Sequence, residues 1–585
     1  MKSLSRREFL KYAGLGTTGV TAAAVLAACG NSNTSAGNDT PNTSTSTNTP
    51  ASSGTTTPAL TEQSTEKTTA EVIDVATRKF TSVTIAMSGD PGTLQPYSPG
   101  GAGRNECKMH LYQGLCGAAP ATSADYPGLR MIMIKGYEKT GENQYDVELK
   151  ENIYDTEGNN VKASDVVFSF QTCLAAGYAA SLGQQLESVE AIGDYKVRFH
   201  AKQDQMGTIK TILTGANIVT QKAWEDSPDE MTTTPVGTGP WTMTDWQLGA
   251  FYLFERREDY WNIDEDPTKM AELELQNVDK IYYEIIKDNT TSAMALENFE
   301  IDQGNVSNAD LGNFVDPNTY APKEGYNSIL YKSNNGPYLS FNCSADSPCA
   351  DINLRKAIAL CIDNAAAGEL VMGARYIPVK GFMLEAWEGH CVDLLPDNDY
   401  YEYNPELAKE YLEKSSYDGR KLRVLPNVAY KDFAVLMQAY GSDIGIDFDI
   451  ILLESALYES EHISLDTTKY DIDIVFSKGD YVWAPYQDLS ATNWSNNLGN
   501  YYLYDEEFEK LYAAVKKPDM TPEDALALHD YVKEQCYAYM IYSSYSFKIT
   551  TDKISNIVCT MTSIIPGACT VVADEDWPHM SARKR

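Results

Sequence analysis

The sequence predicts an α/β fold built from several lobes. The chain has 585 residues of ordinary globular composition, 43% hydrophobic and 22% charged. A length near four times the usual ~150 residues per domain indicates two to four lobes. From about Lys79 onward, short strand patterns alternate with amphipathic helix patterns, which is typical of an α/β fold with mixed sheets.

The first elements are expected early in this region. A strand is expected at 83–87, where the β-prone run Val-Thr-Ile-Ala-Met is broken by the turn sequence at 88–92. A helix is expected to begin at Ser164, whose hydroxyl suits an N-cap, and to end at Gly177.

Three more helices and one strand are expected in the second half of the chain. Asn353 precedes apolar residues that recur with helical spacing over 354–362. Asn404 and Thr521 are each followed by a proline, and such pairs commonly begin a helix. The run 470–476, Tyr-Asp-Ile-Asp-Ile-Val-Phe, alternates polar and apolar side chains and predicts a strand.

The charge balance excludes some classes of partner. Asp and Glu number 82 against 47 Lys and Arg, which gives a formal net charge of −35. Nucleic acids and anionic membranes are bound by clustered basic side chains, so neither is expected as a partner. The 38 tyrosines favour a binding surface, because tyrosine offers a stacking face and a hydroxyl, but tyrosine also serves as core filler.

The N-terminus has the pattern of an export signal. Arg6 and Arg7 form a twin-arginine pair, and the mildly apolar stretch 12–28 follows. The tetrapeptide 26–29, Leu-Ala-Ala-Cys, resembles a bacterial lipobox, so Cys29 is expected to be lipidated and to anchor the protein to the cell membrane. The alternative is an ordinary cleaved signal with an incidental cysteine. A G-x-G-x-x-G pattern at 14–19 lies inside this leader without a preceding strand and is discarded as a dinucleotide motif.

A tether is expected between this anchor and the folded body. The stretch from residue 30 to about 69 consists almost only of Asn, Ser, Thr, Gly, Pro and Ala, and it has no aromatic residue. Such a segment buries too little apolar area to offset its ordering entropy. It is expected to be a flexible linker.

Ten cysteines lie in the expected body, and an exported protein meets an oxidising compartment. Cys343 with Cys349 and Cys107 with Cys116 are candidate disulfide pairs. Cys361 is expected to be a small buried residue of an amphipathic helix. The spacings do not match the paired C-x2-C knuckles of a structural zinc site, and no metal site is expected.

Five stretches in a fixed order carry a family resemblance. They are MSGDPGTLQP at 87–96, the segment 145–170 with its KASDVVFSF run, the segment 235–261 with PVGTGPW and DYW, YLSFN at 338–342, and LRKAI with a following Ile-Asp at 354–363. Together they resemble the family 5 extracellular solute-binding proteins, the receptors of oligopeptide and dipeptide ABC importers. The resemblance covers roughly residues 80 to 560.

The resemblance implies a two-lobed periplasmic-binding-protein-like type II fold (cluster C) with an additional inserted domain. It implies a monomeric receptor without enzymatic activity or cofactor, which captures a peptide between its lobes by hinge closure and delivers it to ABC permease subunits. The expected parts are a signal peptide (1–28), a lipidated cysteine with its tether (29–78), lobe I (79–108, 232–334 and 545–577), an inserted small domain (109–231) and lobe II (335–544).

The resemblance also implies where the cargo binds. In the oligopeptide-binding relatives, an Asp-Tyr pair after the equivalent strand supplies an aspartate that pairs with the α-ammonium group of the peptide. Asp480 and Tyr481 match this pair, and a carboxylate suits a desolvated ammonium. Alternatively, Asp480 is a solvated loop residue or is neutralised by Lys478. Tyr481 and Trp483 are expected either as pocket walls or as plain packing.

Three further residues are weaker cleft candidates. Asp90 and Gln95 lie in the first loop, and Asn342 ends a strand. For each of them, a role in capping a turn is the favoured alternative.

Other functions remain open. The same fold could bind an oligosaccharide, a nickel complex, haem or an opine, although the six histidines have no metal-ligand spacing. An exported hydrolase is disfavoured, since G-x-S-x-G and H-E-x-x-H motifs are missing, but a catalytic triad need not be local in sequence. A surface adhesin would need neither a cleft nor an acidic anchor.

Overall fold

The protein is represented by a computed structural model. Its described residues are 79–98, 101–396, 400–462, 466, 468–477, 479–490 and 504–583. The expected signal peptide, Cys29 and the expected tether lie outside the described residues. By contacts the chain divides into two units, 1–61 and 62–585, and all described elements belong to the second.

The first sheet combines strands from distant parts of the sequence. Its strands, in spatial order, are β1 (Ser82–Met87), β10 (Lys280–Ile285), β9 (Phe251–Arg256) and β8 (Trp241–Gln247). β1 runs parallel to β10, and the other pairs are antiparallel. The strand expected at 83–87 is confirmed. Helix α2 (Arg104–Leu111) contacts β8.

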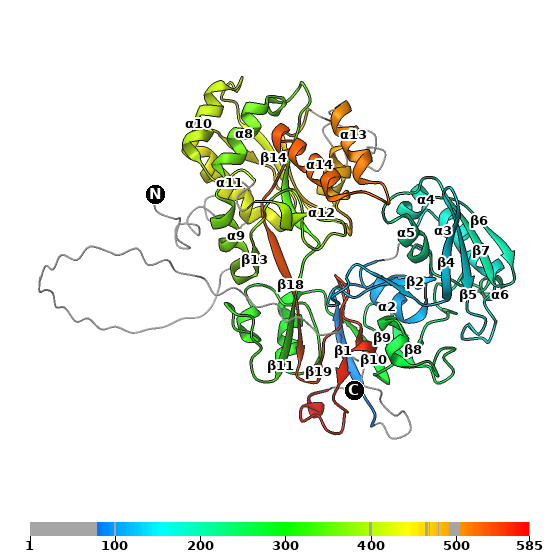
Figure 1. The fold of residues 1–585 in the computed structure, drawn as a ribbon. Coiled ribbons are helices and arrows are strands. Elements are labelled where there is room, and N and C mark those ends of the chain that lie inside the picture. The colour runs from blue at the N-terminus through cyan, green and yellow to red at the C-terminus, as the bar shows by residue number, and fades with distance from the viewer. Residues whose placement is uncertain are drawn as a thin grey trace, which may run out of the picture. The chain divides into compact units, whose positions relative to one another are not determined.

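A second, antiparallel sheet lies within residues 134–201. Its strands, in spatial order, are β4 (Ile134–Gly141), β5 (Gln144–Leu149), β7 (Lys196–Ala201) and β6 (Leu186–Gly193). Helix α3 (Ala163–Ala175) packs against β6 and β7 (Figure 1), where Phe170 and Phe199 form an edge-to-face pair with centroids 5.0 Å apart. Three short helices complete this part: α4 (Ala180–Gln185), α5 (Thr208–Thr214) and α6 (Gln221–Asp226).

The third sheet has five strands and carries most of the long helices. Its strands, in spatial order, are β15 (Phe448–Ile450), β14 (Leu422–Pro426), β16 (Ile472–Ser477), β12 (Gly336–Phe341) and β17 (Ala538–Met540). The helices in this part of the chain are α8 (Ile352–Cys361), α9 (Asn364–Met372), α10 (Pro405–Lys414), α11 (Lys431–Ile444), α12 (Ser455–His462), α13 (Glu506–Val515) and α14 (Pro522–Gln535). Figure 1 shows α8, α10 and α11 gathered near β14.

Two of the four expected helix starts are confirmed, and two are wrong by a few residues. Asn404 caps α10 by accepting from the Leu407 backbone N–H, and Thr521 caps α14 within a capping box. Helix α8 is capped by Asp351, not by Asn353. Helix α3 begins at Ala163, before the expected Ser164. In both cases a carboxylate near the first turn competes successfully with the neutral polar side chain that the sequence suggested.

The alternation in the run 470–476 predicted the strand but not its surroundings. β16 pairs with β14 on one side and β12 on the other. Its polar Asp473 is therefore as fully buried as its apolar neighbour Ile474. A central strand with both faces covered has no solvent face, so here the polar residues mark internal contacts.

Two short segments connect the third sheet to another set of strands. β11 (Tyr326–Lys332) pairs with β18 (Ser543–Thr551), which also pairs with β13 (Tyr376–Ile377). The links are 333–335, between β11 and β12, and 541–542, between β17 and β18.

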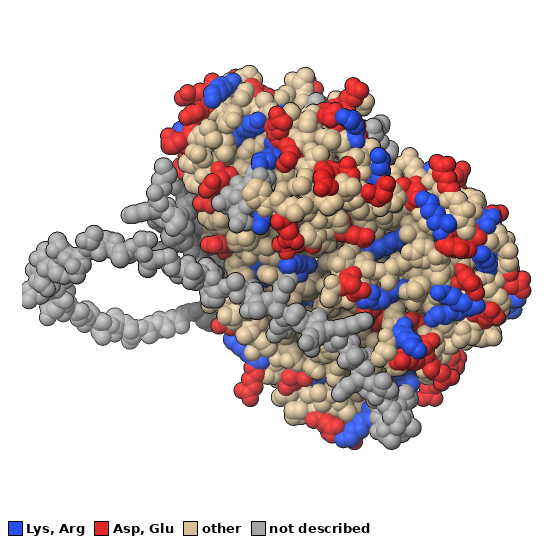
Figure 2. Space-filling model, viewed as in Figure 1, with Lys and Arg blue, Asp and Glu red and all other residues tan. Residues whose placement is uncertain are grey.

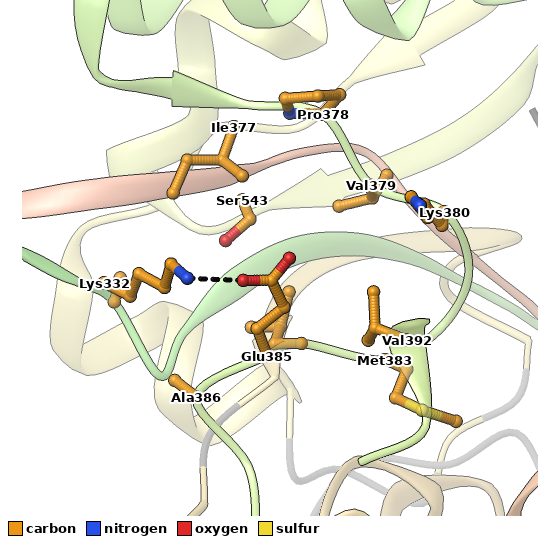
Figure 3. Close-up of a pocket in the computed structure, with 12 residues that line it drawn as sticks. Lys332, Ile377, Pro378, Val379, Lys380, Met383, Glu385, Ala386, Val392 and Ser543 are labelled. Carbon is orange, nitrogen blue, oxygen red and sulfur yellow. Dashed lines mark hydrogen bonds and ion pairs between the residues drawn. The ribbon is translucent and has the colours of Figure 1, made fainter. Parts of the chain in front are cut away.

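A small pocket lies beside these two links. It contains an ion pair between Lys332 Nζ and Glu385, 2.5 Å apart (Figure 3).

Neither of the two candidate disulfide pairs is formed. All ten cysteines from Cys107 to Cys569 are free thiols in the described structure, so neither Cys343 with Cys349 nor Cys107 with Cys116 is bridged. The expectation for Cys361 is confirmed, because its side chain is buried within α8. Burial raises the pKa values of these thiols; for Cys569 the value rises to about 12.

Within the described part of the chain, no single helix is long and apolar enough to cross a membrane. The bent pair formed by α8 and the stretch from Asn364 to Arg375 meets the length and composition criteria only when taken together.

Acidic side chains are spread over the visible face, and basic side chains lie between them (Figure 2). On this face, the acidic side chains are thus distributed and not gathered into a single block.

Candidate functional site

The loop after β16 carries the candidate acid. β16 ends at Ser477, and Gly479 turns the chain with a φ of 145°. A side chain at Gly479 would meet Ala484, because a Cβ there would lie 2.4 Å from the Ala484 Cβ. The loop is then held by the backbone of Glu388, which donates to the Asp480 carbonyl at 2.7 Å and accepts from the Val482 N–H at 2.9 Å.

The Asp480 carboxylate has partners from three distant segments. Tyr126 Oη donates to Oδ1 at 2.7 Å, and Asn334 Nδ2 approaches the same oxygen at 3.4 Å. Lys210 Nζ lies 3.2 Å from Oδ2, and the two side chains are 13% and 32% exposed. Burial, followed by the charge of Asp480, raises the pKa of Tyr126, so this hydroxyl stays protonated and can donate.

The aromatic residues after Asp480 pack against the N-terminal end of α5. Tyr481 and Trp483 are stacked with centroids 5.7 Å apart, and Trp483 Nε1 donates to the Met206 carbonyl at 3.3 Å. Tyr481 lies against Gly207, where a Cβ would be only 2.3 Å from its Cζ. Gly207 also has a φ of 85°, which glycine adopts without strain. This position thus requires glycine for two reasons.

A pocket of about 450 Å³ opens where these segments meet. One wall is formed by α4, α5 and the residues before α4, and the other by the loop after β16. The lining residues are Tyr178, Ala179, Ser181, Leu182, Lys210, Thr211, Thr214, Gly215, Asp480 and Tyr481. An ion pair, two tyrosines and several hydroxyls suit a polar solute of modest size.

The two expected roles of Tyr481 and Trp483 are divided between them. Tyr481 lines the pocket, while Trp483 is not among the lining residues and packs against Tyr481 and the Met206 backbone. Burial, followed by the charges of Glu388 and Asp480, raises the pKa of Tyr481.

Two of the weaker candidates, Asp90 and Gln95, do not line this pocket. Asp90 accepts from the Gly92 N–H at 2.7 Å and from Tyr252 Oη at 2.9 Å, and it thereby holds its own turn against β9. Gln95 Nε2 donates to Glu230 at 2.8 Å. Asp90 therefore has the turn-holding contact that the sequence offered as the alternative, whereas the Gln95 side chain contacts a residue far along the chain.

Asn342 belongs to a different polar network. It is fully buried, its amide donates to the Tyr470 carbonyl at 2.7 Å, and its Oδ1 accepts from the Ser344 N–H at 3.0 Å. Its backbone N–H donates to the Asp471 carbonyl at 2.9 Å. Asn342 therefore ties the end of β12 to the start of β16, outside the pocket lining.

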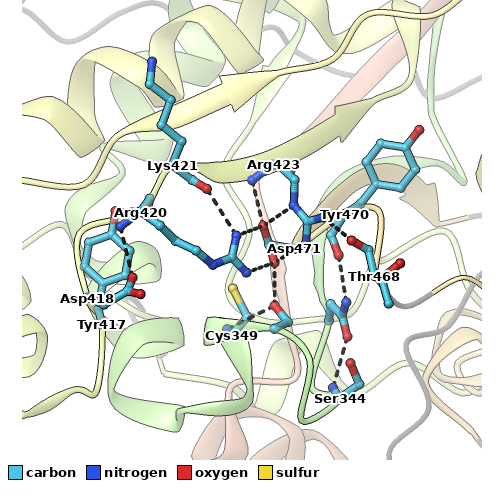
Figure 4. A network of polar contacts seen from close by, with 12 residues as sticks. Ser344, Cys349, Tyr417, Asp418, Arg420, Lys421, Arg423, Thr468, Tyr470 and Asp471 are labelled. Carbon is cyan, nitrogen blue, oxygen red and sulfur yellow. Dashed lines mark hydrogen bonds and ion pairs between the residues drawn. The ribbon is translucent and has the colours of Figure 1, made fainter.

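Asp471 is the centre of that network (Figure 4). Arg420 and Arg423 each donate to both of its oxygens, at 2.8 to 3.0 Å, and Ser347 Oγ donates at 2.9 Å. Burial favours the neutral acid, but the hydrogen bonds from Arg423 and Arg420 outweigh it and lower the pKa of Asp471 to about 2.

Sequence reasoning missed the partners of Asp480. Tyr126 and Lys210 lie 354 and 270 positions before it in the chain, and Asn334 lies 146 positions before it. The sequence alternative named Lys478, which lies outside the described residues. A local pattern cannot reveal a pair of such separation, because only the fold brings the segments together.

Among the described residues, no group of three or more His, Cys, Asp and Glu side chains is placed to hold a metal ion. The side chains that line the pocket offer charge pairing, hydroxyl hydrogen bonds and aromatic contact.

Residues 130–500 match the model of the bacterial extracellular solute-binding proteins, family 5 Middle. The match spans more than half of the chain, and the protein belongs to this family. It is therefore an extracytoplasmic solute-binding protein of the kind that serves ABC transporters, as the sequence resemblance implied.

Known relatives differ in what their names say they bind. The chain is 23% identical over 432 residues to the oligopeptide-binding protein AppA of Bacillus subtilis, covering 65% of this chain and 74% of AppA. It is 27% identical over 250 residues to the nickel-binding periplasmic protein of Escherichia coli, covering 38% of this chain and 43% of that protein.

Solved structures confirm the fold class. The substrate-binding protein CtaP of Listeria monocytogenes aligns with a TM-score of 0.70 at 19% identity, covering 84% of this chain and all of CtaP. AppA of Bacillus subtilis, solved with a nonapeptide, aligns with a TM-score of 0.64 at 16% identity, covering 85% of this chain and all of AppA. The expected two-lobed α/β binding-protein fold is confirmed.

Proposed function

We propose that this protein captures peptides in the pocket between the loop after β16 and helices α4 and α5, and delivers them to an ABC permease. The observation that carries the proposal is the meeting of Asp480 and Tyr481, from the loop after β16, with Lys210, from residues 109–231, at one pocket. A site assembled from two such parts can close over a solute and remove water from its polar contacts.

Peptide is the cargo that these features favour. An extended peptide offers backbone amides and carbonyls for hydroxyl groups and strand edges to bind, while tyrosine walls accept varied side chains. Several similar proteins, including AppA, are named for oligopeptide or dipeptide binding. The parts expected from the sequence keep their bounds in this proposal: lobe I at 79–108, 232–334 and 545–577, the small domain at 109–231 and lobe II at 335–544. The small domain and lobe II supply the two sides of the pocket.

The links 333–335 and 541–542 are proposed to be the hinge. They join the five-stranded sheet to β11 and β18, and they are side by side because β11 pairs with β18 and β12 pairs with β17. Two adjacent short crossings let one sheet rotate against the other with few changes in backbone angles.

Export and anchoring complete the proposal. The twin-arginine pair and the lipobox-like tetrapeptide support export of a folded chain, cleavage after residue 28 and lipidation of Cys29. The polar stretch that follows would hold the monomeric receptor near its permease. A mass for the mature N-terminal fragment that lacks a lipid would contradict this part.

Native mass spectrometry of the protein from its own host tests the cargo. We expect a bound mass that fragments into amino-acid residues. Asp480→Asn should reduce its occupancy, and Asp264→Asn, a change at an exposed acid outside the pocket lining, should not. A bound oligosaccharide, nickel complex, haem or opine would replace peptide as the cargo, and turnover of a bound peptide would contradict the role as a receptor.

A further inference from the structure

The link 333–335 lies directly beside the loop that carries Asp480. β12 begins at Gly336 and runs antiparallel to β16, and Gly336 is paired with Ser477, the last residue of β16. Ser477 Oγ adds to this pair, because it accepts from the Gly336 N–H at 3.2 Å and donates to the Gly336 carbonyl at 3.0 Å. Antiparallel strands run in opposite directions, so the residues before Gly336 lie next to those that follow Ser477. The link and the loop are therefore neighbours.

Asn334, in the middle of the link, reaches the Asp480 carboxylate with its side chain. Its Nδ2 donates to Tyr126 Oη at 3.1 Å and to Asp480 Oδ1 at 3.4 Å. Tyr126 Oη in turn donates to the same Asp480 oxygen at 2.7 Å. An amide nitrogen has two N–H groups, so one side chain can serve both acceptors. The three groups form a triangle with corners in the small domain, in the link and in the loop after β16.

The backbone of Asn334 is held by the segment that also holds the Asp480 loop. The Asn334 carbonyl accepts from Trp387 Nε1 at 3.0 Å, and Trp387 is only 1% exposed. The next residue, Glu388, donates its backbone N–H to the Asp480 carbonyl at 2.7 Å. A fixed backbone leaves the Asn334 amide little freedom to turn away from Asp480. The side chain is thus preorganised for the triangle.

Rotation at the proposed hinge would break two sides of this triangle. Tyr126 belongs to the small domain and Asp480 to lobe II, so opening the pocket takes the Tyr126 hydroxyl away from both Asp480 and Asn334. Hydrogen bonds that form at only one hinge angle stabilise that angle relative to the others. The bond to the Asp480 carboxylate is charge-assisted, and such bonds are the stronger kind.

We propose that Asn334 is a positioning residue that couples the pocket to the hinge. Its amide stabilises the hinge angle at which Tyr126 and Asp480 face each other, and it thereby keeps the pocket assembled. The inference rests on the proposed function and its hinge. Asn334 is not among the lining residues, so it acts on the cargo through the fraction of assembled pocket and not through a cargo contact. A smaller assembled fraction weakens the binding of every cargo by the same factor.

The first test measures the hinge without any cargo. In the full chain, spin labels on Glu506→Cys in α13 and Glu187→Cys in β6, two exposed positions, report the distance between lobe II and the small domain by double electron–electron resonance. Asn334→Ala is expected to lower the ratio of short to long distances about threefold to tenfold, the effect of losing hydrogen bonds of ordinary strength. Asn335→Ala, at the exposed neighbour in the same link, is the matched control and should leave the ratio unchanged.

A double-mutant cycle with Tyr126 makes this test specific to the triangle. Tyr126→Phe removes the hydroxyl from the other corner, so it should lower the same ratio as Asn334→Ala does. Adding Asn334→Ala to Tyr126→Phe should then change the ratio by less than about twofold, because the shared contact is already gone. Tyr126→Phe also keeps the inference testable if Asn334→Ala does not fold.

The second test measures binding. Calorimetry gives the affinities of individual members of a library of tripeptides to pentapeptides for the full chain, freed of ligand by unfolding and refolding. Asn334→Ala should weaken all binding members by one common factor of about three to ten and leave their order unchanged. Asn335→Ala should bind them as the wild type does.

The outcomes separate this inference from the proposed function. If Asn334→Ala changes neither the distances nor the affinities, the inference is overturned while peptide binding stands. A changed order of affinities would make Asn334 a cargo contact, and full additivity with Tyr126→Phe would make its effect independent of the triangle; either result overturns the inference. If no peptide binds but the distances shift as expected, the proposed cargo fails and the coupling to the hinge stands.

Discussion

Two aspartates lie just outside opposite ends of strand β16, and their surroundings differ. Asp471 is fully buried and receives paired hydrogen bonds from Arg420 and Arg423. Asp480 is 32% exposed at its side chain and receives single contacts from Tyr126, Asn334 and Lys210. One strand thus positions both a carboxylate that is enclosed by its partners and one that faces a pocket.

The difference teaches how an acid that is enclosed by its partners differs from one that is available at a pocket. Both arginines of Asp471 are near it in the fold of a single sheet, and their planar groups match its two oxygens. Removing Asp471 leaves the charges of both arginines without their carboxylate partner. Lys210 reaches Asp480 from another part of the chain, and an ammonium on a flexible stem can share its N–H groups with a ligand.

The largest effect is expected for Asp471→Asn. The change leaves two arginines without their buried carboxylate, and losing one partner of a buried ion pair costs about 3–5 kcal/mol in the free energy of unfolding. Urea denaturation measures this loss in the free energy of unfolding. Asp480→Asn is the matched control, and its partly exposed pair should cost about 1 kcal/mol or less. Equal losses for the two variants would remove the distinction between the two acids.

A second test adds a methyl group at Gly207, where the N-terminal end of α5 meets the loop after β16. Gly207→Ala places a Cβ against the Tyr481 ring and strains a positive φ, so we expect a loss of roughly 1–3 kcal/mol in unfolding free energy and weaker cargo binding. Gly249→Ala is the control, because Gly249 also has a positive φ, of 76°, but open space around its Cβ position. It should lose stability through backbone strain alone and bind normally. Normal binding by Gly207→Ala would contradict the site.

The third test uses pH. The pKa of Asp471 is lowered in the folded protein from its ordinary 3.8 to about 2. The unfolded chain therefore binds a proton first as the pH falls, so the stabilisation is complete above 3.8 and is lost as the pH drops through 2. The wild type should lose about 2 kcal/mol more than Asp471→Asn between pH 5 and pH 2. Parallel stability profiles of the two proteins would contradict the lowered pKa.

The smallest effect is expected at Trp483. Trp483→Phe removes the hydrogen bond to the Met206 carbonyl while keeping an aromatic ring for Tyr481 to stack on. The loss should be about 1 kcal/mol in unfolding free energy, with cargo affinity changed by less than about threefold. Thermal denaturation and calorimetry measure the two quantities. A large loss of affinity would move Trp483 from a packing role into the site.

The order of elements was predictable from short patterns, and the burial of particular residues was not. Asn404 and Thr521 were identified as helix caps because a cap acts on the backbone of the next turn. The alternating run around Asp473 gave the strand correctly, yet that side chain lies inside the protein. Alternation reports the geometry of a strand, while its burial depends on which strands become its neighbours.

The sequence by itself determined the solute-binding family, the α/β fold and the loop that carries Asp480 and Tyr481, because these depend on local motifs in a fixed order. Only the tertiary structure decided that Lys210 and Tyr126 pair with Asp480, that Asn342 belongs to the Asp471 network, and that the cysteines are unbridged in the described structure. The physical reason is distance along the chain. A contact between residues hundreds of positions apart leaves no local pattern, and it exists only because the packed sheets bring the two segments together.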